Sequence, residues 1–164
     1  MKPFDRAQAE YLVNTYSDMI LRLSYTYLKS THDAEDICQT VFLKYLTCEQ
    51  TFDSPEHEKA WILRTAVNAC KDVLKSSWRM RTCDIESCAQ VAAPSQVQGS
   101  ILSAVQELPD KYRIPLYLHY YEGYKIREIA ELLGERPATI NTRMERGRNR
   151  LRHMLGGNCC EQGV

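Results

Sequence analysis

The sequence predicts an all-α protein built from two small helical domains that are joined by a flexible linker. Three observations support this fold class. Apolar residues recur at helical spacing, only 6 prolines and 7 glycines interrupt 164 residues, and one internal stretch loses all periodicity. With 44% hydrophobic and 26% charged residues, the composition is that of a globular chain, which excludes a disordered or fibrous protein.

The first predicted domain covers residues 1–81 and holds three helices. The first helix carries an apolar stripe that ends near Lys29-Ser30-Thr31, where short polar residues favour a cap. The second follows at once, and the third opens at Ser54-Pro55-Glu56 and reaches about Arg79. The side chains expected to pack inside are Ala34, Ile37, Cys38, Val41, Phe42 and Tyr45 of the second helix and Trp61, Ile62, Ala66, Ala69, Val73 and Leu74 of the third.

Residues 82–99 form the predicted linker, because small and polar residues replace the apolar pattern there. The second predicted domain, residues 100–156, begins with a short helix over 101–106. A helix opened by Pro109 then ends at a Gly123 cap, the next helix ends at Gly134, and a last one opens at Pro137 and reaches about Leu155. The tail, residues 157–164, is expected to be disordered.

The net charge of zero conceals four blocks of alternating sign. Lys and Arg number five against ten Asp and Glu in residues 1–58, six against one in 59–81, four against eight in 82–135 and six against two in 136–164. Because local charge attracts phosphate, the two basic blocks favour two nucleic-acid contacts, with acidic surface left for another partner. Solvated helix faces are the alternative explanation.

The strongest local pattern is Ile126-x-x-Ile129-Ala130-x-x-Leu133-Gly134 followed by Pro137-Ala138-Thr139-Ile140, which predicts a helix-turn-helix. Small and cationic residues lie opposite the expected inner face of the last helix, as in a recognition helix that enters the major groove. A basic C-terminal helix that only complements its own dipole is the alternative. The inner face is Ile140, Met144, Gly147 and Leu151; the outer face is Ala138, Thr139, Thr142, Glu145, Arg146 and Asn149, with Arg143, Arg148 and Arg150 on its flanks.

The third helix is also basic. Its cations and two tryptophans are suited to single-stranded nucleic acid, which is bound by charge and base stacking. The alternative is a surface with two packed tryptophans, and these residues taken alone favour it. The residues concerned are Lys59, Trp61, Arg64, Lys71, Lys75, Trp78, Arg79 and Arg81.

An enzyme is disfavoured by the sequence. A nucleophilic pair of His32 or His57 with Cys38 or Cys70 would need an accessible thiol, yet both cysteines fall on or beside apolar helix faces. No glycine-rich phosphate loop and no cluster of carboxylates is present, so no cofactor and no metal are expected.

The seven cysteines are an odd number without a Cys-x-x-Cys pair, which favours reduced thiols over a disulfide framework. The linker and tail cysteines, Cys83, Cys88, Cys159 and Cys160, leave a redox sensor open as an alternative, although the sequence shows no arrangement near them that lowers a thiol pKa. No apolar run approaches the roughly 20 residues of a membrane span, and a cytoplasmic protein is expected.

Three stretches resemble one family. Asp33-Ala34-Glu35-Asp36-Ile37-Cys38-Gln39-Thr40-Val41-Phe42 is similar to the Asp-Ala-Glu-Asp-x-x-Gln-x-x-Phe signature of bacterial RNA polymerase sigma factors of the extracytoplasmic-function class. Ala60-Trp61-Ile62-Leu63-Arg64-Thr65-Ala66-x-Asn68 resembles the next conserved stretch of that family. Leu108-Pro109, Tyr121-Glu122-Gly123-Tyr124 and Glu128-Ile129-Ala130-x-x-Leu133-Gly134 resemble its second DNA-binding domain. The resemblance covers residues 5–155 in the family's order.

This resemblance implies a promoter-specificity subunit of the polymerase. Residues 1–81 would be sigma region 2, and residues 100–156 would be region 4, a winged-helix-like helix-turn-helix domain. Region 2 would dock on the clamp coiled coil of core RNA polymerase, and the loop 47–53 with the start of the third helix would hold a flipped base of the single-stranded minus-ten element. The last helix would read the minus-thirty-five element as duplex. An anti-sigma factor is the further partner that the resemblance implies.

The residues that this resemblance assigns fall into three groups. They are Asp33, Glu35, Asp36, Gln39 and Phe42 for the polymerase; Arg64, Asn68, Lys71, Lys75 and Arg79 for the minus-ten element; and Arg136, Ala138, Thr139, Thr142, Arg143, Arg146 and Arg150 for the minus-thirty-five element.

Two points limit what the resemblance implies. Arg136 stands where many members have a capping serine or threonine, and Ala138-Thr139-Ile140 replaces their Gly-Thr-Val, so promoter preference does not transfer. The alternative function is a helix-turn-helix transcriptional regulator that binds operator DNA without acting as a polymerase subunit. Such a regulator would have no need of the acidic signature that begins at Asp33.

Overall fold

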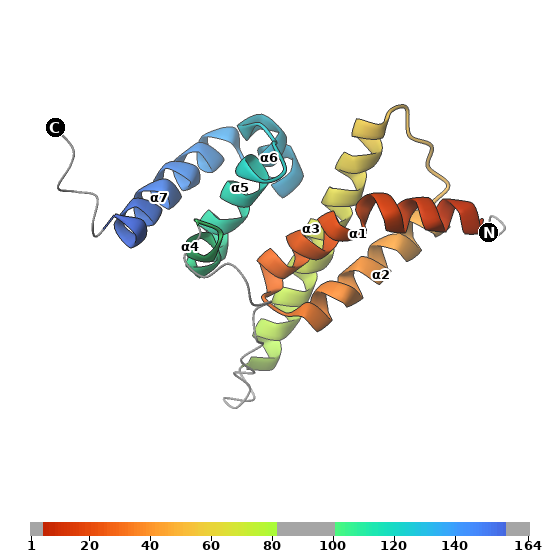
Figure 1. The fold of residues 1–164 in the computed structure, drawn as a ribbon, viewed down its shortest axis with the longest axis horizontal. Coiled ribbons are helices and arrows are strands. Elements are labelled where there is room, and N and C mark those ends of the chain that lie inside the picture. The colour runs from red at the N-terminus through yellow and green to blue at the C-terminus, as the bar shows by residue number, and fades with distance from the viewer. Residues whose placement is uncertain (1–4, 82–100, 157–164) are drawn as a thin grey trace. The chain divides into compact units, whose positions relative to one another are not determined.

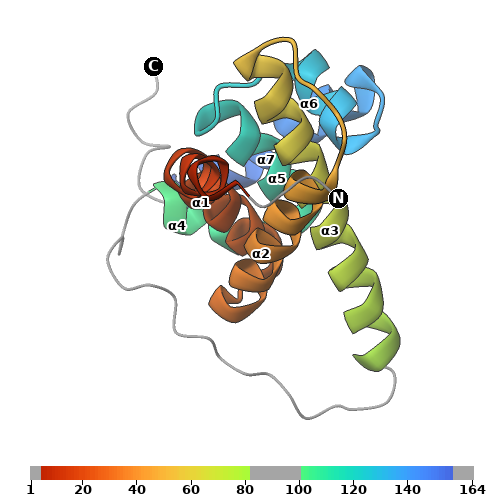
Figure 2. The same ribbon diagram turned by 90° about the vertical axis from the view of Figure 1, so that its right-hand side faces the viewer.

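The computed structural model describes residues 5–81 and 101–156, with side chains described for 5–76 and 103–156. The described residues form seven α-helices and no strand, which confirms the all-α prediction. The chain divides into two compact units, residues 1–91 and 92–164 (Figures 1 and 2). The predicted linker, the predicted tail and their four cysteines lie outside the described residues.

The first unit contains α1 (Arg6–Leu28), α2 (Thr31–Thr47) and α3 (Pro55–Arg81), which lie side by side (Figures 1 and 2). The Ser30 side chain caps α2 by accepting a hydrogen bond from the Asp33 N–H at 3.2 Å. Ser54 does the same for α3, accepting from the His57 N–H at 3.1 Å. The helix starts expected from these two serines are therefore confirmed.

The buried face of α2 follows its predicted stripe, with Phe42 only half-buried. The prediction for α3 was partly wrong. Leu63, Val67 and Cys70 are fully buried although the single apolar stripe did not include them, whereas Trp61 remains half-buried. The cause is that α3 packs against both α1 and α2. Two neighbours bury a wider part of its surface than one neighbour would.

The second unit contains α4 (Ile101–Glu107), α5 (Asp110–Tyr120), α6 (Ile126–Leu133) and α7 (Pro137–Leu155). The α7 helix packs against the other three, and Pro137 opens it as predicted. Gly134 ends α6 with φ +67°, a conformation that favours glycine. The predicted Gly123 cap was wrong: α5 ends earlier, with Tyr121 as its C-cap, because its last turn closes through a hydrogen bond from the Tyr121 N–H to the Tyr117 carbonyl.

Candidate nucleic-acid interface

The residues predicted to dock on the polymerase all project from α2. Glu35, Asp36 and Gln39 are exposed, while Asp33 and Phe42 are half-buried. Glu35, Gln39 and Phe42 follow one another at i, i+4 and i+7, which places them on one side of the helix. Asp33 and Asp36 lie further round the helix, so the five residues spread over about half of its circumference, away from the side that packs into the hydrophobic core.

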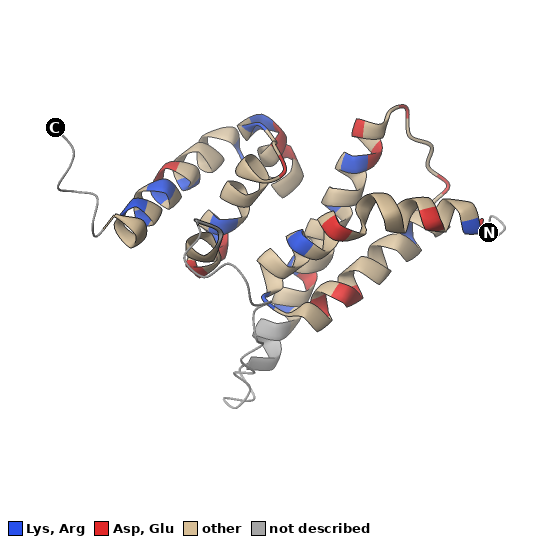
Figure 3. Cartoon of the chain, in the orientation of Figure 1, with Lys and Arg blue, Asp and Glu red and all other residues tan. Residues whose placement is uncertain are grey.

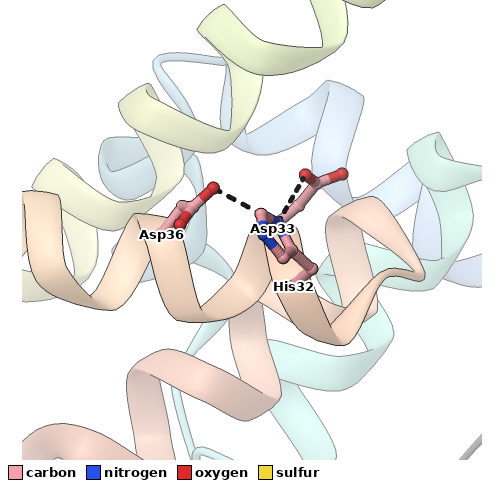
Figure 4. Close-up of side chains that lie close together, drawn as sticks. All are labelled: His32, Asp33 and Asp36. Carbon is pink, nitrogen blue, oxygen red and sulfur yellow. Dashed lines mark ion pairs between the residues drawn. The ribbon is translucent and has the colours of Figure 1, made fainter.

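The first turns of α2 also carry a histidine between two carboxylates (Figure 4). His32 Nδ1 lies 3.4 Å from an oxygen of Asp36 and 4.0 Å from an oxygen of Asp33. Asp33 lies in the first turn, where an anion complements the positive end of the helix dipole. These side chains are mostly in solvent, so their pairing adds little to stability and the surface stays acidic.

The sequence prediction missed Leu43 on this surface. Its side chain is 64% exposed, one turn beyond Gln39. The available signal was a leucine that falls outside the apolar stripe of an amphipathic helix. One exposed leucine is ordinary on a protein surface, so its exposure alone shows no binding partner.

On α3 the cationic side chains lie on the outer surface. Arg64, Asn68 and Lys75 are exposed and Lys71 is half-buried, and their spacing of i, i+4, i+7 and i+11 places the four on one face. Arg79 belongs to α3, but its side chain lies outside those described. Figure 3 shows the Lys and Arg positions along the described part of this helix. The face can follow a nucleic-acid backbone without disturbing the buried side.

A cluster of four aromatic rings lies where the segment 48–54 joins α3. The Phe52 ring stacks on the Tyr45 ring with centroids 5.5 Å apart and an interplanar angle of 19°. The Trp61 ring meets Phe52 edge-on at 5.7 Å, and the His57 ring does so at 5.5 Å. Phe52 and Trp61 are half-buried and His57 is exposed. The sequence predicted a base-holding loop over 47–53 but no such cluster, and the structure ends α2 at Thr47 itself.

The α7 helix separates an inner from an outer face as predicted. Ile140 and Met144 are fully buried, Gly147 is buried and Leu151 is half-buried. The residues predicted to contact DNA lie outside the core. Arg136 is the N-cap residue of α7, and its side chain makes no capping hydrogen bond. Of these residues, Arg136, Ala138, Thr142, Arg146 and Arg150 are exposed, and Thr139 and Arg143 are half-buried.

An open cavity of about 460 Å³ lies between the start of α5 and the first half of α7. Lys111 and Tyr112 from α5 line it, and the sequence prediction missed both, because α5 meets α7 only in the folded unit. Although burial acts in the opposite direction, hydrogen bonding to Lys111 and nearby cationic charge lower the pKa of Tyr112. The lining from α7 consists of Ala138, Thr139, Thr142, Arg143 and Arg146.

The arginines of α7 differ in their contacts. Arg148 Nε donates to the Tyr120 hydroxyl at 2.9 Å, and Arg143 pairs with Glu135 at 3.3 Å. The Arg150 guanidinium lies 4.9 Å from the Tyr112 ring centroid, beside the cavity rather than in its lining. Arg143 and Arg146 therefore line the cavity, and Arg150 lies beside it.

The cysteines that a nucleophilic pair would require are buried. Cys70 is fully inaccessible, and burial raises the pKa of its thiol to about 11. Burial also raises the pKa of Cys38. Both thiols are therefore protonated at neutral pH, which agrees with the sequence argument against this pair. Among the described helices, none combines the length and apolar character needed to cross a membrane.

Two family models match the chain in order. The Sigma-70 region 2 model matches residues 12–80, and the Sigma-70, region 4 model matches residues 98–151. RNA polymerase sigma factor SigV of Bacillus subtilis (strain 168) is 31% identical over 137 residues, which cover 82% of each chain. ECF RNA polymerase sigma factor SigW of the same strain is 29% identical over 162 residues, covering 88% of this chain and 87% of SigW.

A solved structure has a similar fold. The sigma factor RpoE from Bartonella quintana, in complex with the anti-sigma factor NepR, has a TM-score of 0.73 at 21% identity, covering 94% of this chain and 99% of that chain. The two family regions lie in the expected order, and SigV is similar over most of its own length. The chain therefore belongs to the sigma-70 family of RNA polymerase sigma factors, in its extracytoplasmic-function class.

Proposed function

We propose that this sigma factor docks on core RNA polymerase through α2 and reads promoter DNA at two places. The minus-ten element is bound as a single strand by α3 and the segment before it. The minus-thirty-five element is bound as duplex by α7. One observation carries the proposal: in each unit, the outward face of a helix whose other face is buried bears the cations that phosphate contacts need.

Docking on the polymerase uses the acidic face of α2, formed by Asp33, Glu35, Asp36, Gln39 and Phe42, to which we add the exposed Leu43. The clamp coiled coil of the polymerase is the partner that we propose for it. Charged residues at the rim of an interface favour encounter and orientation, whereas an apolar side chain gains free energy by leaving water. Leu43 supplies the apolar contribution, and Asp36 supplies the charge.

For the minus-ten element we propose a flipped base at the segment 47–53, next to the aromatic cluster of Tyr45, Phe52, His57 and Trp61. Aromatic rings bind unpaired bases by stacking, and nearby cations bind the backbone. Beyond this cluster, the outer face of α3 would contact the backbone of the same DNA strand. Its contributing residues are Arg64, Asn68, Lys71, Lys75 and Arg79.

For the minus-thirty-five element we propose that the outer face of α7 enters the major groove. Arg146 lines the cavity between α5 and α7 and has a side chain long enough to reach a base edge. Arg136 and Arg150 flank it and contact phosphate. The remaining contacts come from Ala138, Thr139, Thr142 and Arg143.

The protein works in the cytoplasm as a non-catalytic subunit, residues 1–81 and 100–156 act as its two functional domains, and an anti-sigma factor is its regulatory partner. The solved structure of the sigma factor RpoE in complex with the anti-sigma factor NepR supports this last part of the proposal. An operator-binding regulator is not favoured, because residues 12–80 match Sigma-70 region 2, which such a protein does not require.

Run-off transcription with purified bacterial core polymerase tests the proposal. The template is a promoter library with randomised minus-ten and minus-thirty-five positions. We expect defined transcripts only when both the protein and core polymerase are present, from templates enriched in two separate elements. A gel shift of duplex DNA by the protein alone, with no transcript in the presence of core polymerase, would instead identify an operator-binding regulator.

A further inference from the structure

A buried carboxylate in the first unit has no part in the contacts proposed so far. Glu58, in the first turn of α3, is only 8% exposed. Its Oε2 accepts hydrogen bonds from the Tyr16 hydroxyl at 2.7 Å and the Tyr11 hydroxyl at 3.0 Å. Its Oε1 accepts one from the Tyr45 hydroxyl. Since Tyr11 and Tyr16 belong to α1 and Tyr45 belongs to α2, one carboxylate joins all three helices of the unit.

The protonation states make these contacts permanent at neutral pH. Burial by itself raises the pKa of a carboxyl group, but the three phenol donors outweigh it and hold the pKa of Glu58 below its usual value. Burial and the hydrogen bond to Glu58 raise the pKa of Tyr16 and Tyr45 well above their usual range. Glu58 is therefore an ionised acceptor, and Tyr16 and Tyr45 keep the protons that they donate.

Tyr45 has a second contact that distinguishes it from the other two phenols. Its ring stacks on Phe52 of the segment 48–54, and Trp61 packs edge-on against it at 5.9 Å. The Tyr16 ring instead meets Tyr11 edge-on at 6.2 Å, on α1. Tyr45 thus connects the buried carboxylate to the segment that carries Phe52.

We propose that the hydrogen bond between Tyr45 and Glu58 positions Phe52, and with it the segment 48–54, for binding of the single-stranded minus-ten element. This inference rests on the function proposed above for residues 47–53, which overlap this segment. With its hydroxyl held by Glu58, the Tyr45 ring offers Phe52 one fixed face to stack on. A segment ordered before binding loses less conformational entropy when the base arrives, so the bound state forms with higher affinity.

A merely structural role for Glu58, holding the three helices together, makes a different prediction. In that case the loss of any of its hydrogen bonds would lower the stability of the unit and affect every function in proportion. A positioning role makes Tyr45 special, because only its ring stacks on Phe52. The two roles are separated by comparing variants that remove the hydrogen-bond donors to one or the other carboxylate oxygen of Glu58.

The test uses the full chain in holoenzyme form. Tyr45→Phe removes the donor to Oε1 and keeps the ring that stacks on Phe52. The matched control is the double variant Tyr11→Phe with Tyr16→Phe, which removes both donors to Oε2. The probe is a fork-junction fragment of a promoter selected from the library, with its minus-thirty-five element as duplex and the non-template minus-ten strand unpaired. A second probe carries the duplex element alone.

We expect Tyr45→Phe to weaken binding of the fork-junction probe about fivefold or more. This loss corresponds to part of the binding free energy that stacking of one base on an aromatic ring supplies. Affinities for the duplex probe and for core polymerase should stay within about twofold of wild type, a change too small for a lost contact. The control variant should keep its affinity for the fork-junction probe even if its thermal stability falls as much as that of Tyr45→Phe. Equal weakening by the control, or no weakening by Tyr45→Phe, would overturn the inference.

A double-mutant cycle with Phe52→Ala tests the route of the effect. If Tyr45 acts through Phe52, Tyr45→Phe should cause no further loss of fork-junction binding in the Phe52→Ala background. Additive losses would show that the hydroxyl does not act through this ring. If the wild-type holoenzyme selects no promoter from the library, the proposed function itself fails; if it selects one and the variants behave alike, only the positioning role fails.

Discussion

A methyl group on Gly147 of α7 would lie 2.8 Å from the Cδ1 atom of Leu116 on α5. It would also lie 3.2 Å from the Cβ atom of Tyr112. Leu116 and Tyr112 are both buried, so neither can move aside at low cost. The close approach of α5 and α7, which shapes the cavity beside α7, therefore depends on the absence of a side chain at this position.

Gly147→Ala should destabilise the second unit by about 1 kcal/mol net, because overpacking costs roughly 1–3 kcal/mol while alanine in a helix regains about 0.5–1. Hydrogen exchange of the α5 and α7 amides in the full chain measures the loss. Asn141→Ala, an exposed change on the same helix, is the control and should leave exchange unchanged or slower. Unchanged protection in Gly147→Ala would mean that the two helices separate without cost.

Arg146 and Arg150 should differ in what they read. Arg146→Ala should cost about 1–3 kcal/mol on the selected minus-thirty-five sequence and less on mutated versions, because a guanidinium that contacts a base edge discriminates between bases. Arg150→Ala should weaken all sequences alike and flatten the dependence of log affinity on log salt by about one unit. Binding of holoenzyme to a panel of duplexes at several salt concentrations measures both. Uniform loss from both variants would show that α7 only grips the backbone.

Reversing charge on the α2 face should abolish docking without unfolding the protein. Asp36→Arg with Gln39→Ala alters two exposed side chains and turns attraction for a basic partner into repulsion. We expect loss of binding to core polymerase with an unchanged circular dichroism spectrum. Unaltered polymerase affinity in the folded double variant would refute the assignment of this face.

Leu43→Ser tests the apolar part of the same face. The side chain is 64% exposed in the free protein, so its replacement should change the free energy of unfolding by less than about 0.5 kcal/mol. Affinity for core polymerase should fall about tenfold, since burying a leucine contributes roughly 1.5–3 kcal/mol. Titration of labelled protein with core polymerase measures this, and Glu49→Ser, at an exposed position beyond the end of α2, is the control.

Acid should destabilise the first unit through Glu58. Because its pKa in the folded state lies below the ordinary value of 4.5, ionised Glu58 stabilises the fold above that pH, and the contribution is lost as pH falls through the folded pKa. Tyr11, Tyr16 and Tyr45 face it, and the raised pKa values of Tyr16 and Tyr45 keep those two phenols protonated throughout that range. Both tryptophans lie in residues 1–81, so their fluorescence during urea unfolding reports this unit. Glu58→Gln should be less stable near neutral pH and lose less stability than wild type on acidification.

Much of the fold could be predicted from the sequence because helix ends are set by local chemistry. Ser30 and Ser54 mark helix starts because their side chains accept hydrogen bonds from backbone N–H groups, and Pro137 marks one because it has no N–H to satisfy. Gly134 marks a helix end because it adopts the left-handed conformation there. The inner and outer faces of α7 follow from spacing alone, since one helix period assigns each residue to a side. The acidic face of α2 was predictable for the same reason.

Only the tertiary structure decided how much of each face is buried and which distant residues meet. A single stripe could not indicate that Leu63 and Val67 are buried, because that depends on α3 having two neighbours. Glu58 reads as an ordinary acid in the first turn of a helix until three tyrosines from α1 and α2 surround it. Lys111 joins the cavity beside α7 only because α5 packs there. Local sequence determines backbone hydrogen bonding over a few residues, whereas burial and long-range contacts depend on how whole helices pack.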